Sequence, residues 1–407
     1  NFFRRNNLYI SHARLAINDL TEKGSQPFTD KKEEIYSITN GEIYNDKELR
    51  IKENLVIESS SDCAVIPELF HRKGFEALSE LNGMFASALV DYRHKRILIF
   101  RDTEGIKPLY YLEKENFLAF SSSNQHLATL FNENRIDPLA ISIFLVLKYV
   151  PAPMTGFRKI KKLIPGEIRI YSLDGNFIES RRIKKREFKL IEHNPKSTRS
   201  LIISSVKEHL NSDVKIASLL SGGLDSSIIT FEAKKLLGDI ETYTAFQEDP
   251  SKDEDVIHSN ILCKEIGIKN NLIKIPNLNY EKISSPLKKI SEPTADPAFI
   301  TGYYLINQIK ESNRVLLSGD GADEIFGGYG ILKKHKDRIN KTNITHGLTE
   351  LIPHFNKYFL PNIIYKNKYT KKILKYFDSS INERLLFLSI YSGLPISLIW
   401  LILPETI

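Results

Sequence analysis

Residues 219–227 of this 407-residue chain read Leu-Leu-Ser-Gly-Gly-Leu-Asp-Ser-Ser, between an apolar run at 214–220 and a helix-like stretch at 226–237. Adjacent glycines let a loop turn its backbone N–H groups inward, and the start of a helix adds free donors and partial positive charge. The serines add hydroxyl donors. A tight turn with a serine cap is the simpler interpretation, but the complete string after an apolar strand favours a phosphate-binding loop.

The sequence around this loop alternates between strand-like and helix-like segments. We predict strands at 214–220, 241–246, 271–275 and 314–317, and helices at 201–210, 226–237, 255–266 and 300–309. This alternation is typical of an α/β domain with a parallel sheet, whose ligands bind beyond the carboxyl ends of the strands. The loops 221–227 and 318–328 are therefore expected at that edge.

The second of these loops is rich in glycine and acidic residues. It continues to residue 329 and reads Ser-Gly-Asp-Gly-Ala-Asp-Glu-Ile-Phe-Gly-Gly-Tyr. Considered by itself, this composition could simply be an acidic surface turn. Phosphate groups at the first loop, however, require Mg²⁺, which binds hard carboxylate ligands. We predict that Asp225 and Asp323 bind the metal, with Asp320 and Glu324 as nearby alternatives.

The front part of the chain follows a different pattern of short strands and antiparallel hairpins. Strands are predicted at 84–92, 96–101, 109–111 and 117–120, after strand-like runs at 8–10, 13–17 and 34–39. A helix is predicted at 62–73, with Asp62 as its N-cap. These elements indicate an α+β domain of layered sheets. The Asn40–Gly41 pair fits either a tight turn or an oxyanion hole, and the local sequence leaves both open.

Composition excludes several classes of protein. Charged residues make up 26% and hydrophobic residues 42%, as in ordinary soluble proteins, and the length suggests two or three domains. The net charge of +7 comes from scattered basic residues without a nucleic-acid motif, so no nucleic-acid partner is expected. Two cysteines indicate a reducing, cytoplasmic setting. The uncharged stretch 385–403 contains Gly393 and Pro395, so we interpret it as two buried helices and expect no membrane partner.

Taken together, these motifs resemble those of the glutamine-dependent asparagine synthetases. The phosphate-loop string and the acidic loop resemble that family's ATP-pyrophosphatase domain, and further matching stretches lie at 12–17, 40–45, 61–62, 101–102, 105–111, 149–153 and 163–166. The resemblance implies an α+β N-terminal glutaminase domain, a truncated Ntn-type sheet sandwich, at residues 1–190. It implies an α/β ATP-pyrophosphatase domain with a parallel sheet, truncated at its C-terminal end, at residues 191–407.

In the front domain, the resemblance implies a pocket for glutamine. Arg14 matches the clamp on the glutamine carboxylate, a task suited to a bidentate guanidinium. Glu42 and Asp62 match the acids near the glutamine ammonium group. Asn40 and Gly41 match the two residues of the oxyanion hole. The backbone of Ile17 and Asn18 would also contribute to the pocket.

In the second domain, the resemblance implies adenylation. The aspartate side chain attacks the α-phosphorus of ATP, pyrophosphate leaves, and ammonia from glutamine attacks the resulting aspartyl-AMP. The positions matching the ATP pocket are Leu220, Ser221, Gly222, Gly223, Asp225, Ser226, Ala245, Ser318 and Gly319. The candidate catalytic acids are Asp225, Asp320, Asp323 and Glu324, with Mg²⁺ on Asp225 and Asp323, and Glu292 to Pro297 resemble a stretch near the amino-acid substrate.

One departure from the family concerns the glutaminase nucleophile. In the family it is an N-terminal cysteine whose own amine serves as the base, whereas this chain begins at Asn1. Cys63, on the predicted helix beside Asp62, is a poor substitute. We therefore expect a fragment that lacks both ends of the family's chain and is inactive as a glutaminase in this form.

Two alternatives to an asparagine synthetase stay open. A related enzyme could use the same adenylation to close a lactam or to amidate another carboxylate, as β-lactam synthetases do. The retained Arg14, Glu42 and Asp62 argue against it, because a lost glutaminase needs no such pocket. The other alternative, a degenerate scaffold, has no need of the retained carboxylates and double-glycine loops. A homodimer is compatible with the resemblance.

Overall fold

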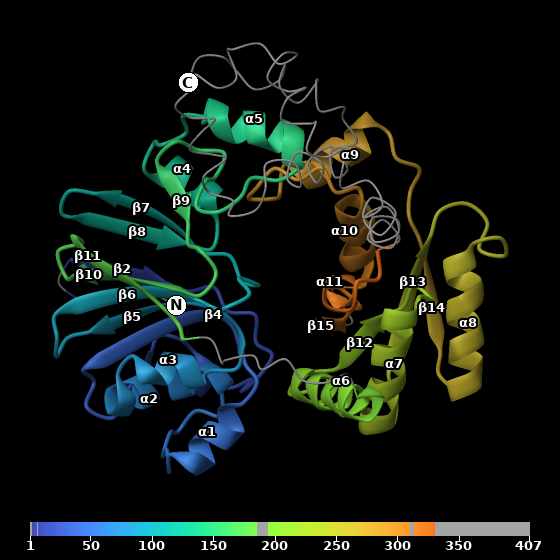
Figure 1. Ribbon diagram of the computed structural model, residues 1–407, viewed down its shortest axis with the longest axis horizontal. Coiled ribbons are helices and arrows are strands. Elements are labelled where there is room, and N and C mark those ends of the chain that lie inside the picture. Colours follow the sequence, from blue (N-terminus) through green and yellow to red (C-terminus); the bar gives the residue numbers. More distant parts are fainter. Residues whose placement is uncertain (1, 6, 185–193, 310–312, 330–407) are drawn as a thin grey trace, which may run out of the picture. The chain divides into compact units, whose positions relative to one another are not determined.

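The computed structural model describes residues 2–5, 7–184, 194–309 and 313–329 (Figure 1). Among the described residues, those within 2–144 and 149–318 belong to one compact unit, and residues 145–148 and 319–329 belong to a second. We refer to residues 1–184 as the first half and residues 194–329 as the second half. The predicted helices at 385–403 lie outside the described residues.

The first half is organised around a six-stranded antiparallel sheet with the order β11-β10-β6-β5-β4-β3. Its two longest strands, β4 and β5, pair along their whole length, from Ile35 opposite Asp91 to Ile43 opposite Gly83. The sheet's strands are β3 (Phe28–Thr29), β4 (Ile35–Ile43), β5 (Gly83–Asp91), β6 (Arg96–Arg101), β10 (Glu167–Ser172) and β11 (Phe177–Arg182).

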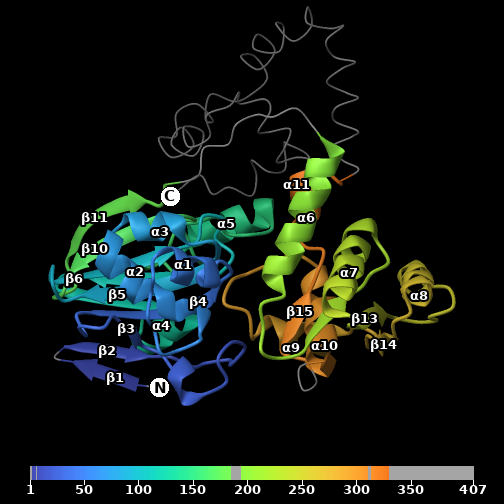
Figure 2. The same cartoon turned by 90° about the horizontal axis from the view of Figure 1, so that it is seen from below.

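Both faces of this sheet are covered, because alternate residues of its central strands are apolar on both sides. Leu89, Leu98 and Phe100 pack against the helices α2 (Val65–Lys73) and α3 (Glu76–Glu80). Their neighbours along the strands, such as Val90 and Ile99, pack in a second cluster on the opposite face. In Figure 2, α2 and α3 lie in front of the strands of this sheet. This layered packing agrees with the predicted α+β domain.

The second face is covered by short strands that complete the first half. These are the hairpin β1 (Phe2–Arg5) and β2 (Leu8–Ser11), and a three-stranded sheet of β7 (Tyr110–Lys114), β8 (Phe117–Ser121) and β9 (Ile160–Lys162) in the order β8-β7-β9. The remaining helical elements are η1 (Glu22–Gly24), α1 (Asp46–Lys52), η2 (Asp62–Ala64), α4 (Asn124–Leu130) and α5 (Pro138–Leu147).

The second half contains a four-stranded sheet with the order β14-β13-β12-β15, and every pair in it is parallel. Its strands are β12 (Ile216–Leu219), β13 (Glu241–Phe246), β14 (Asn270–Lys274) and β15 (Val315–Leu317). The helices of this half are α6 (Pro195–His209), α7 (Leu224–Leu237), α8 (Glu254–Ile266), α9 (Tyr280–Leu287), α10 (Ala298–Ile309) and α11 (Ala322–Phe326). The predicted parallel sheet is confirmed.

Two predictions for the first half are wrong. Residues 13–17 form no strand, and Arg14 turns back onto main-chain carbonyls of the same loop. The helix predicted at 62–73 is present as η2 followed by α2, but Asp62 caps neither, since its carboxylate reaches across to the N–H of Ile43. The Asn40–Gly41 pair, for which the sequence left a tight turn and an oxyanion hole open, lies inside β4.

Within the part of the chain that the structure describes, no helix combines the length and the apolar character needed to cross a bilayer.

Candidate active sites

A cavity of about 180 Å³ opens in the first half at the end of β4. It brings together all the residues that the sequence predicted for a glutamine pocket, which are Arg14, Ile17, Asn18, Asn40, Gly41, Glu42 and Asp62. Further lining residues that the sequence analysis did not single out include His12, Gln26, Thr39, Ser61 and Lys107. His12, Ser61 and Lys107 lie within the matching stretches 12–17, 61–62 and 105–111, so their place in those motifs was the available signal.

Arg14 is half-buried, and neighbouring main-chain carbonyls hold it in place. Its guanidinium donates to the carbonyl of Asn18 at 2.8 Å, to that of Thr21 at 3.0 Å, and to that of Asp19. These bonds fix the direction of a side chain that would otherwise be flexible. Because a guanidinium carries five N–H donors, Arg14 retains the capacity to bind a carboxylate in the cavity.

Two carboxylates face the cavity close to each other. Asp62 is buried, accepts from the N–H of Ile43 at 2.6 Å and lies 3.5 Å from the side-chain amide of Asn18. Burial, together with the negative charge of Asp62, raises the pKa of Glu42 to about 7, while Lys107 acts in the opposite direction. The two carboxylates therefore repel each other when both are ionised, and a ligand ammonium group placed beside them would relieve that repulsion.

Gly41 is required by the close approach of two strands. It pairs with Phe85 inside the β4–β5 ladder at a φ of +148°. A Cβ atom at this position would lie 2.0 Å from the carbonyl oxygen of Met84. Only glycine fits there, and the main chain of residues 40–41 consequently forms part of the cavity wall.

Lys107 reaches the cavity from a turn that one buried acid organises. Asp102, which belongs to the predicted 101–102 motif, accepts main-chain hydrogen bonds from Glu104, Ile106 and Lys107, and a fourth from Phe85 in β5. The turn is thereby tied to the strand next to β4. The 101–102 motif therefore has a structural role, because it holds the turn that places the Lys107 ammonium group at the cavity.

Cys63 lines the same cavity but is buried, with its sulfur 3.5 Å from the carbonyl oxygen of Gly41 and 3.5 Å from Asp62. Burial and the adjacent Asp62 carboxylate raise the pKa of the Cys63 thiol well above its usual range. Since the thiolate is the nucleophilic form, this cysteine is a poor nucleophile, in agreement with the sequence analysis.

In the second half, the phosphate-loop string connects β12 to α7, as predicted. Ser221 and Ser226 join the two ends of the loop through their hydroxyl groups, 3.1 Å apart, and the Ser226 hydroxyl also donates to the carbonyl of Gly223. Gly223 is the N-cap residue of α7 and makes no side-chain cap. The first-turn N–H groups of α7 are therefore available to an anion. Ser227 instead lines a separate cavity of about 540 Å³ with residues of α6 and α8.

Gly222 holds this loop against α8. Its φ is +74°, and a Cβ atom would lie 2.7 Å from the Cβ of His258 and 2.8 Å from the main-chain nitrogen of Ser259. The loop is thus pressed onto a helix on one side. Its conformation depends on a glycine, as the sequence predicted.

The other positions predicted for the ATP pocket surround the ends of neighbouring strands. Leu220 is fixed to β13, because its N–H donates to the carbonyl of Tyr243 and its carbonyl accepts from the Thr244 hydroxyl at 2.6 Å. Ala245 follows Thr244 in β13. Strands β12 and β15 pair in parallel, so Ser318, directly after β15, leaves the sheet at the same edge as Leu220.

The acidic loop belongs to the second compact unit from Gly319 onward. Asp323 and Glu324 lie in the first turn of the short helix α11, and Asp320 precedes it. The hydrogen bond from the Tyr329 hydroxyl lowers the pKa of Glu324. Asp225 lies in the first unit, at the start of α7, so a metal site shared by Asp225 and Asp323 stays a prediction.

Glu292, from the stretch predicted near the amino-acid substrate, is held by the first half of the chain. Its carboxylate accepts from the ammonium group of Lys162 at 2.6 Å and from the hydroxyl of Tyr110. Two further contacts cross between the halves nearby: the hydroxyl of Ser291 donates to that of Ser123, and the side-chain amide of Gln125 donates to the carbonyl of Ile290.

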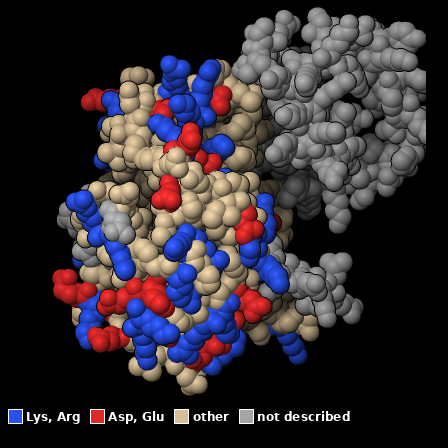
Figure 3. Space-filling view, turned by 90° about the vertical axis from the view of Figure 1, so that its left-hand side faces the viewer, with Lys and Arg blue, Asp and Glu red and all other residues tan. Residues whose placement is uncertain are grey.

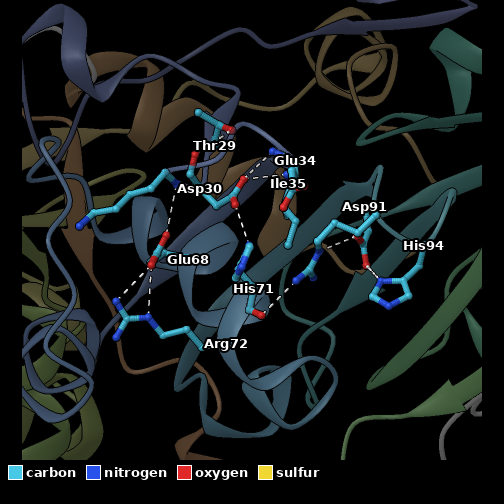
Figure 4. Close-up of polar contacts among 11 residues, drawn as sticks. Thr29, Asp30, Glu34, Ile35, Glu68, His71, Arg72, Asp91 and His94 are labelled. Atoms are coloured by element: carbon cyan, nitrogen blue, oxygen red, sulfur yellow. Dashed lines mark hydrogen bonds and ion pairs between the residues drawn. The ribbon is translucent and has the colours of Figure 1, made fainter.

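A polar cluster beside β3 and α2 contains side chains that a metal could use (Figure 4). Asp30, Glu34 and His71 each offer a ligand atom, and these atoms lie within 4.8 Å of one another. Asp30, however, accepts from the N–H groups of Glu34 and Ile35 with one oxygen, and its other oxygen lies 2.7 Å from His71. These contacts secure the β3–β4 turn to α2, so the cluster is structural.

Basic and acidic side chains lie side by side on the face of the molecule drawn in Figure 3. Ion pairs such as Lys73 with Glu53 and Glu80, and Arg169 with Glu113, show the same mixing. On this face the positive charge does not gather into one continuous surface of the kind that binds nucleic acid.

Comparisons with known proteins match the two halves separately. A glutamine amidotransferase domain family matches residues 1–181, and the asparagine synthase family matches residues 197–382. The predicted boundary at residue 190 lies between the two matches and stays a prediction. A solved structure of an allosteric regulatory enzyme of purine biosynthesis aligns with 75% of this chain and 74% of its own at 13% identity, but the TM-score of 0.33 supports no argument.

Curated relatives extend across both halves. Asparagine synthetase [glutamine-hydrolyzing] 1 of Bacillus subtilis is 32% identical over 365 residues, covering 87% of this chain and 57% of the relative. A putative asparagine synthetase of Methanocaldococcus jannaschii is 30% identical, covering 80% and 68%, and a probable one of Acanthamoeba polyphaga mimivirus is 30% identical, covering 93% and 75%. The chain thus spans between about half and three quarters of these relatives' lengths, and it belongs to the glutamine-hydrolysing asparagine synthetase family.

Proposed function

We propose that the protein containing this chain is a glutamine-dependent asparagine synthetase, which converts aspartate to asparagine through an aspartyl-AMP intermediate. The observation that carries the proposal is the joint presence of two sites in one chain. A cavity with a held guanidinium and two carboxylates lies in the first half, and a loop with free main-chain donors lies in the second. The family membership supports the same conclusion.

In the first half, we propose that the cavity binds glutamine. Arg14 would hold the ligand's carboxylate, and Glu42 and Asp62 its ammonium group, because these charges match an amino acid at opposite ends. The main chain of Asn40 and Gly41 would stabilise the oxyanion that forms during hydrolysis. We also propose that this half has the Ntn-type fold, which the two-sided packing of its six-stranded sheet supports.

In the second half, we propose that the loop from Ser221 to Ser226 holds the pyrophosphate portion of ATP. The donors there are main-chain N–H groups and two hydroxyls, which stabilise negative charge without forming covalent bonds. The aspartate carboxylate would attack the α-phosphorus, with pyrophosphate as the leaving group. Ammonia would then attack the acyl carbon and displace AMP. Leu220, Ala245, Ser318 and Gly319 would line the nucleotide pocket.

Mg²⁺ is the expected counter-ion of the pyrophosphate. The chemistry of the donor set fits, because Asp225 and Asp323 supply hard carboxylate oxygens, and Asp320 and Glu324 lie near the second of them in the sequence. When bound, the ion would neutralise charge on the leaving group. The aspartates' role would be to hold it while the loop's N–H groups orient the phosphates.

Pyrophosphate release tests this proposal. The full-length protein is expected to release pyrophosphate from ATP when aspartate is present. Release with another carboxylic acid but not with aspartate would point to a related adenylating enzyme instead, such as one that closes a lactam.

A variant tests the metal assignment. Asp323→Asn should reduce release by at least about a hundredfold, the scale of a lost metal contact, without changing thermal unfolding. Asp174→Asn, at an exposed turn of the first half, serves as a matched control and should behave like the wild type. Wild-type release by Asp323→Asn would remove the metal assignment.

A further inference from the structure

The loop at residues 16–19 forms one wall of the cavity in the first half and is held from outside the cavity by the second half. Ile17 and Asn18 line the cavity. The main-chain N–H of Asp213 donates to the carbonyl of Ile17 at 3.1 Å, and its carboxylate accepts from the main-chain N–H of Asp19 at 2.7 Å. One residue of the second half therefore contacts the residues on either side of Asn18.

A third contact comes from Arg314, whose guanidinium donates to the carbonyl of Ala16 at 3.1 Å. Asp213 precedes β12, and Arg314 directly precedes β15. These two strands are parallel neighbours, with Ile216 opposite Val315. Both contacts on the pocket loop thus come from the amino ends of adjacent strands, within the same compact unit as the pocket.

The carboxyl ends of the same two strands lead to the phosphate loop and to Ser318. Each strand is only three or four residues long, so about 10–13 Å separates its ends. Strand β12 is hydrogen-bonded on both sides, to β13 and to β15, whereas β15 is the edge strand of this sheet. Because hydrogen-bonded strands resist stretching along their axes, a displacement at the phosphate edge would be carried along β12 to Asp213 and, through its pairing with β15, to Arg314.

Within the pocket, Asp19 passes such a displacement to a second wall. Its backbone has a φ of +56°, and its buried carboxylate accepts from the Ser59 hydroxyl at 2.8 Å and from the Ser60 N–H at 2.9 Å. Ser61, the next residue, lines the cavity. Moving Asp19 would therefore change the cavity on two sides.

We propose that Asp213 and Arg314 are positioning residues that tie the glutamine-pocket loop to the two strands carrying the nucleotide edge, so that nucleotide binding changes the affinity for glutamine. The inference rests on the proposed function of the two sites. The proposal adds a physical connection between the two sites. Hydrogen bonds link the amino ends of β12 and β15 to the pocket loop, and the nucleotide would contact their carboxyl ends. Because coupling between binding sites is reciprocal, glutamine should change nucleotide affinity by the same factor.

The test compares three variants by calorimetric titration of the 407-residue chain with L-glutamine. Asp213→Ala removes the acceptor of the Asp19 N–H and should weaken glutamine binding by about tenfold, while Asp213→Asn keeps an acceptor and should stay within about twofold of the wild type. Asn211→Ala is the matched control, because Asn211 also contacts the first half, at Lys47 and Asp46, but neither residue lines the cavity. The control should bind glutamine like the wild type.

The coupling is measured by repeating the titrations with saturating α,β-methylene-ATP and Mg²⁺. This analogue should change the glutamine Kd of the wild type and of Asn211→Ala, but not that of a variant carrying both Asp213→Ala and Arg314→Ala. Thermal unfolding and binding of the analogue alone verify that each variant is folded. If Asp213→Ala does not fold, Arg314→Ala alone replaces it.

Wild-type glutamine affinity in a folded variant lacking these contacts would overturn the inference. So would a wild-type Kd that the analogue leaves unchanged, or a coupling that persists in the double variant. Absence of glutamine binding by the wild type, in contrast, would overturn the proposed pocket itself and the inference with it.

Discussion

The two candidate sites use different groups to bind a ligand. The cavity of the first half uses charged side chains that are held close together at the end of a sheet. The phosphate loop of the second half uses main-chain N–H groups between a strand and a helix. Burial, together with repulsion from Asp62, raises the pKa of Glu42 to about 7 in the free cavity. The phosphate loop instead depends on the conformation of Gly222 and Gly223.

This difference between side-chain charges and main-chain donors explains how each site would select its ligand. Side-chain charges in a small cavity recognise a ligand by the number and spacing of its own charges, and their strength changes with pH. Main-chain donors recognise any anion of suitable shape, and their geometry is sensitive to backbone substitutions. The two sites should therefore respond to different perturbations.

The first site also contains one backbone requirement, at Gly41, and a substitution there should have the greatest effect. Gly41→Ala places a Cβ 2.0 Å from the carbonyl oxygen of Met84 and should destabilise the chain by more than about 3 kcal/mol. Gly74 also has a positive φ, of +59°, but a Cβ there would meet nothing within 4 Å, so Gly74→Ala should cost only backbone strain, about 1–3 kcal/mol. Urea unfolding distinguishes them. Equal midpoints would contradict the described pairing of β4 with β5.

At the phosphate loop, binding should depend on the backbone conformation of Gly222. Gly222→Ala forces the loop away from Ser259 on α8 and should weaken binding of an ATP analogue at least about tenfold while leaving glutamine binding unchanged. Gly238→Ala, at the other end of α7, has a φ of +83° and open space around it, so it controls for backbone strain alone. Equal analogue affinities for the two variants, measured by calorimetry, would show that the loop does not bind the nucleotide.

The third prediction concerns pH and applies to the cavity. A pKa of about 7 means that Glu42 is neutral below that pH, so the pocket loses one of the two charges that attract an ammonium group. Glutamine affinity should therefore fall as pH decreases below 7, by up to about tenfold between pH 8 and pH 6. Titrations across this range provide the measurement. A flat profile in the wild type would exclude Glu42 from ammonium binding.

Glu42→Gln provides the matching control. It should bind glutamine more weakly but without that pH dependence. Since burial raises the folded-state pKa of Glu42, its ionisation opposes folding as pH rises through about 7. The variant should consequently gain thermal stability relative to the wild type at pH 8 and little at pH 4.

The smallest expected effect concerns Cys63, which lines the cavity without taking part in its chemistry. Because its thiol is buried and its pKa is raised, alkylation by iodoacetamide in the native state should be much slower than in urea. Cys63→Ala should cost about 1 kcal/mol and leave glutamine affinity within about twofold. Mass spectrometry measures the rate of alkylation. Rapid alkylation of Cys63 in the native state would contradict the buried, unreactive thiol described here.

Much of the fold could be predicted from the sequence, because long apolar strands and glycine-rich turns carry strong local signals. The parallel sheet, β5, β6 and the strand–loop–helix around Gly222 all follow this rule. Helices α1 and α9 did not appear in the prediction. The first is short and mostly polar, and the second contains Pro286, a residue type associated with the end or interruption of a helix.

For the sites, sequence motifs located the residues but not their environment. The Asn40–Gly41 pair looks locally like a turn, and only pairing with β5, more than forty residues away, makes it part of a strand. Asp62 resembles an N-cap for the same reason, because its true partner, Ile43, comes from a distant segment. The raised pKa of Glu42 and the approach of Lys107 likewise depend on tertiary contacts that no local pattern contains.

The strand order β14-β13-β12-β15 has a consequence for how the chain folds during synthesis. Strand β12 gains its first neighbour, β13, soon after it leaves the ribosome, but its other neighbour is the last strand of the sheet. Until Val315–Leu317 emerges, one edge of β12 has no strand partner and can pair with other chains. This edge of β12 therefore stays unprotected while residues 220–314 are synthesised, and a chain that stops shortly before Val315 should aggregate more readily than one that includes β15.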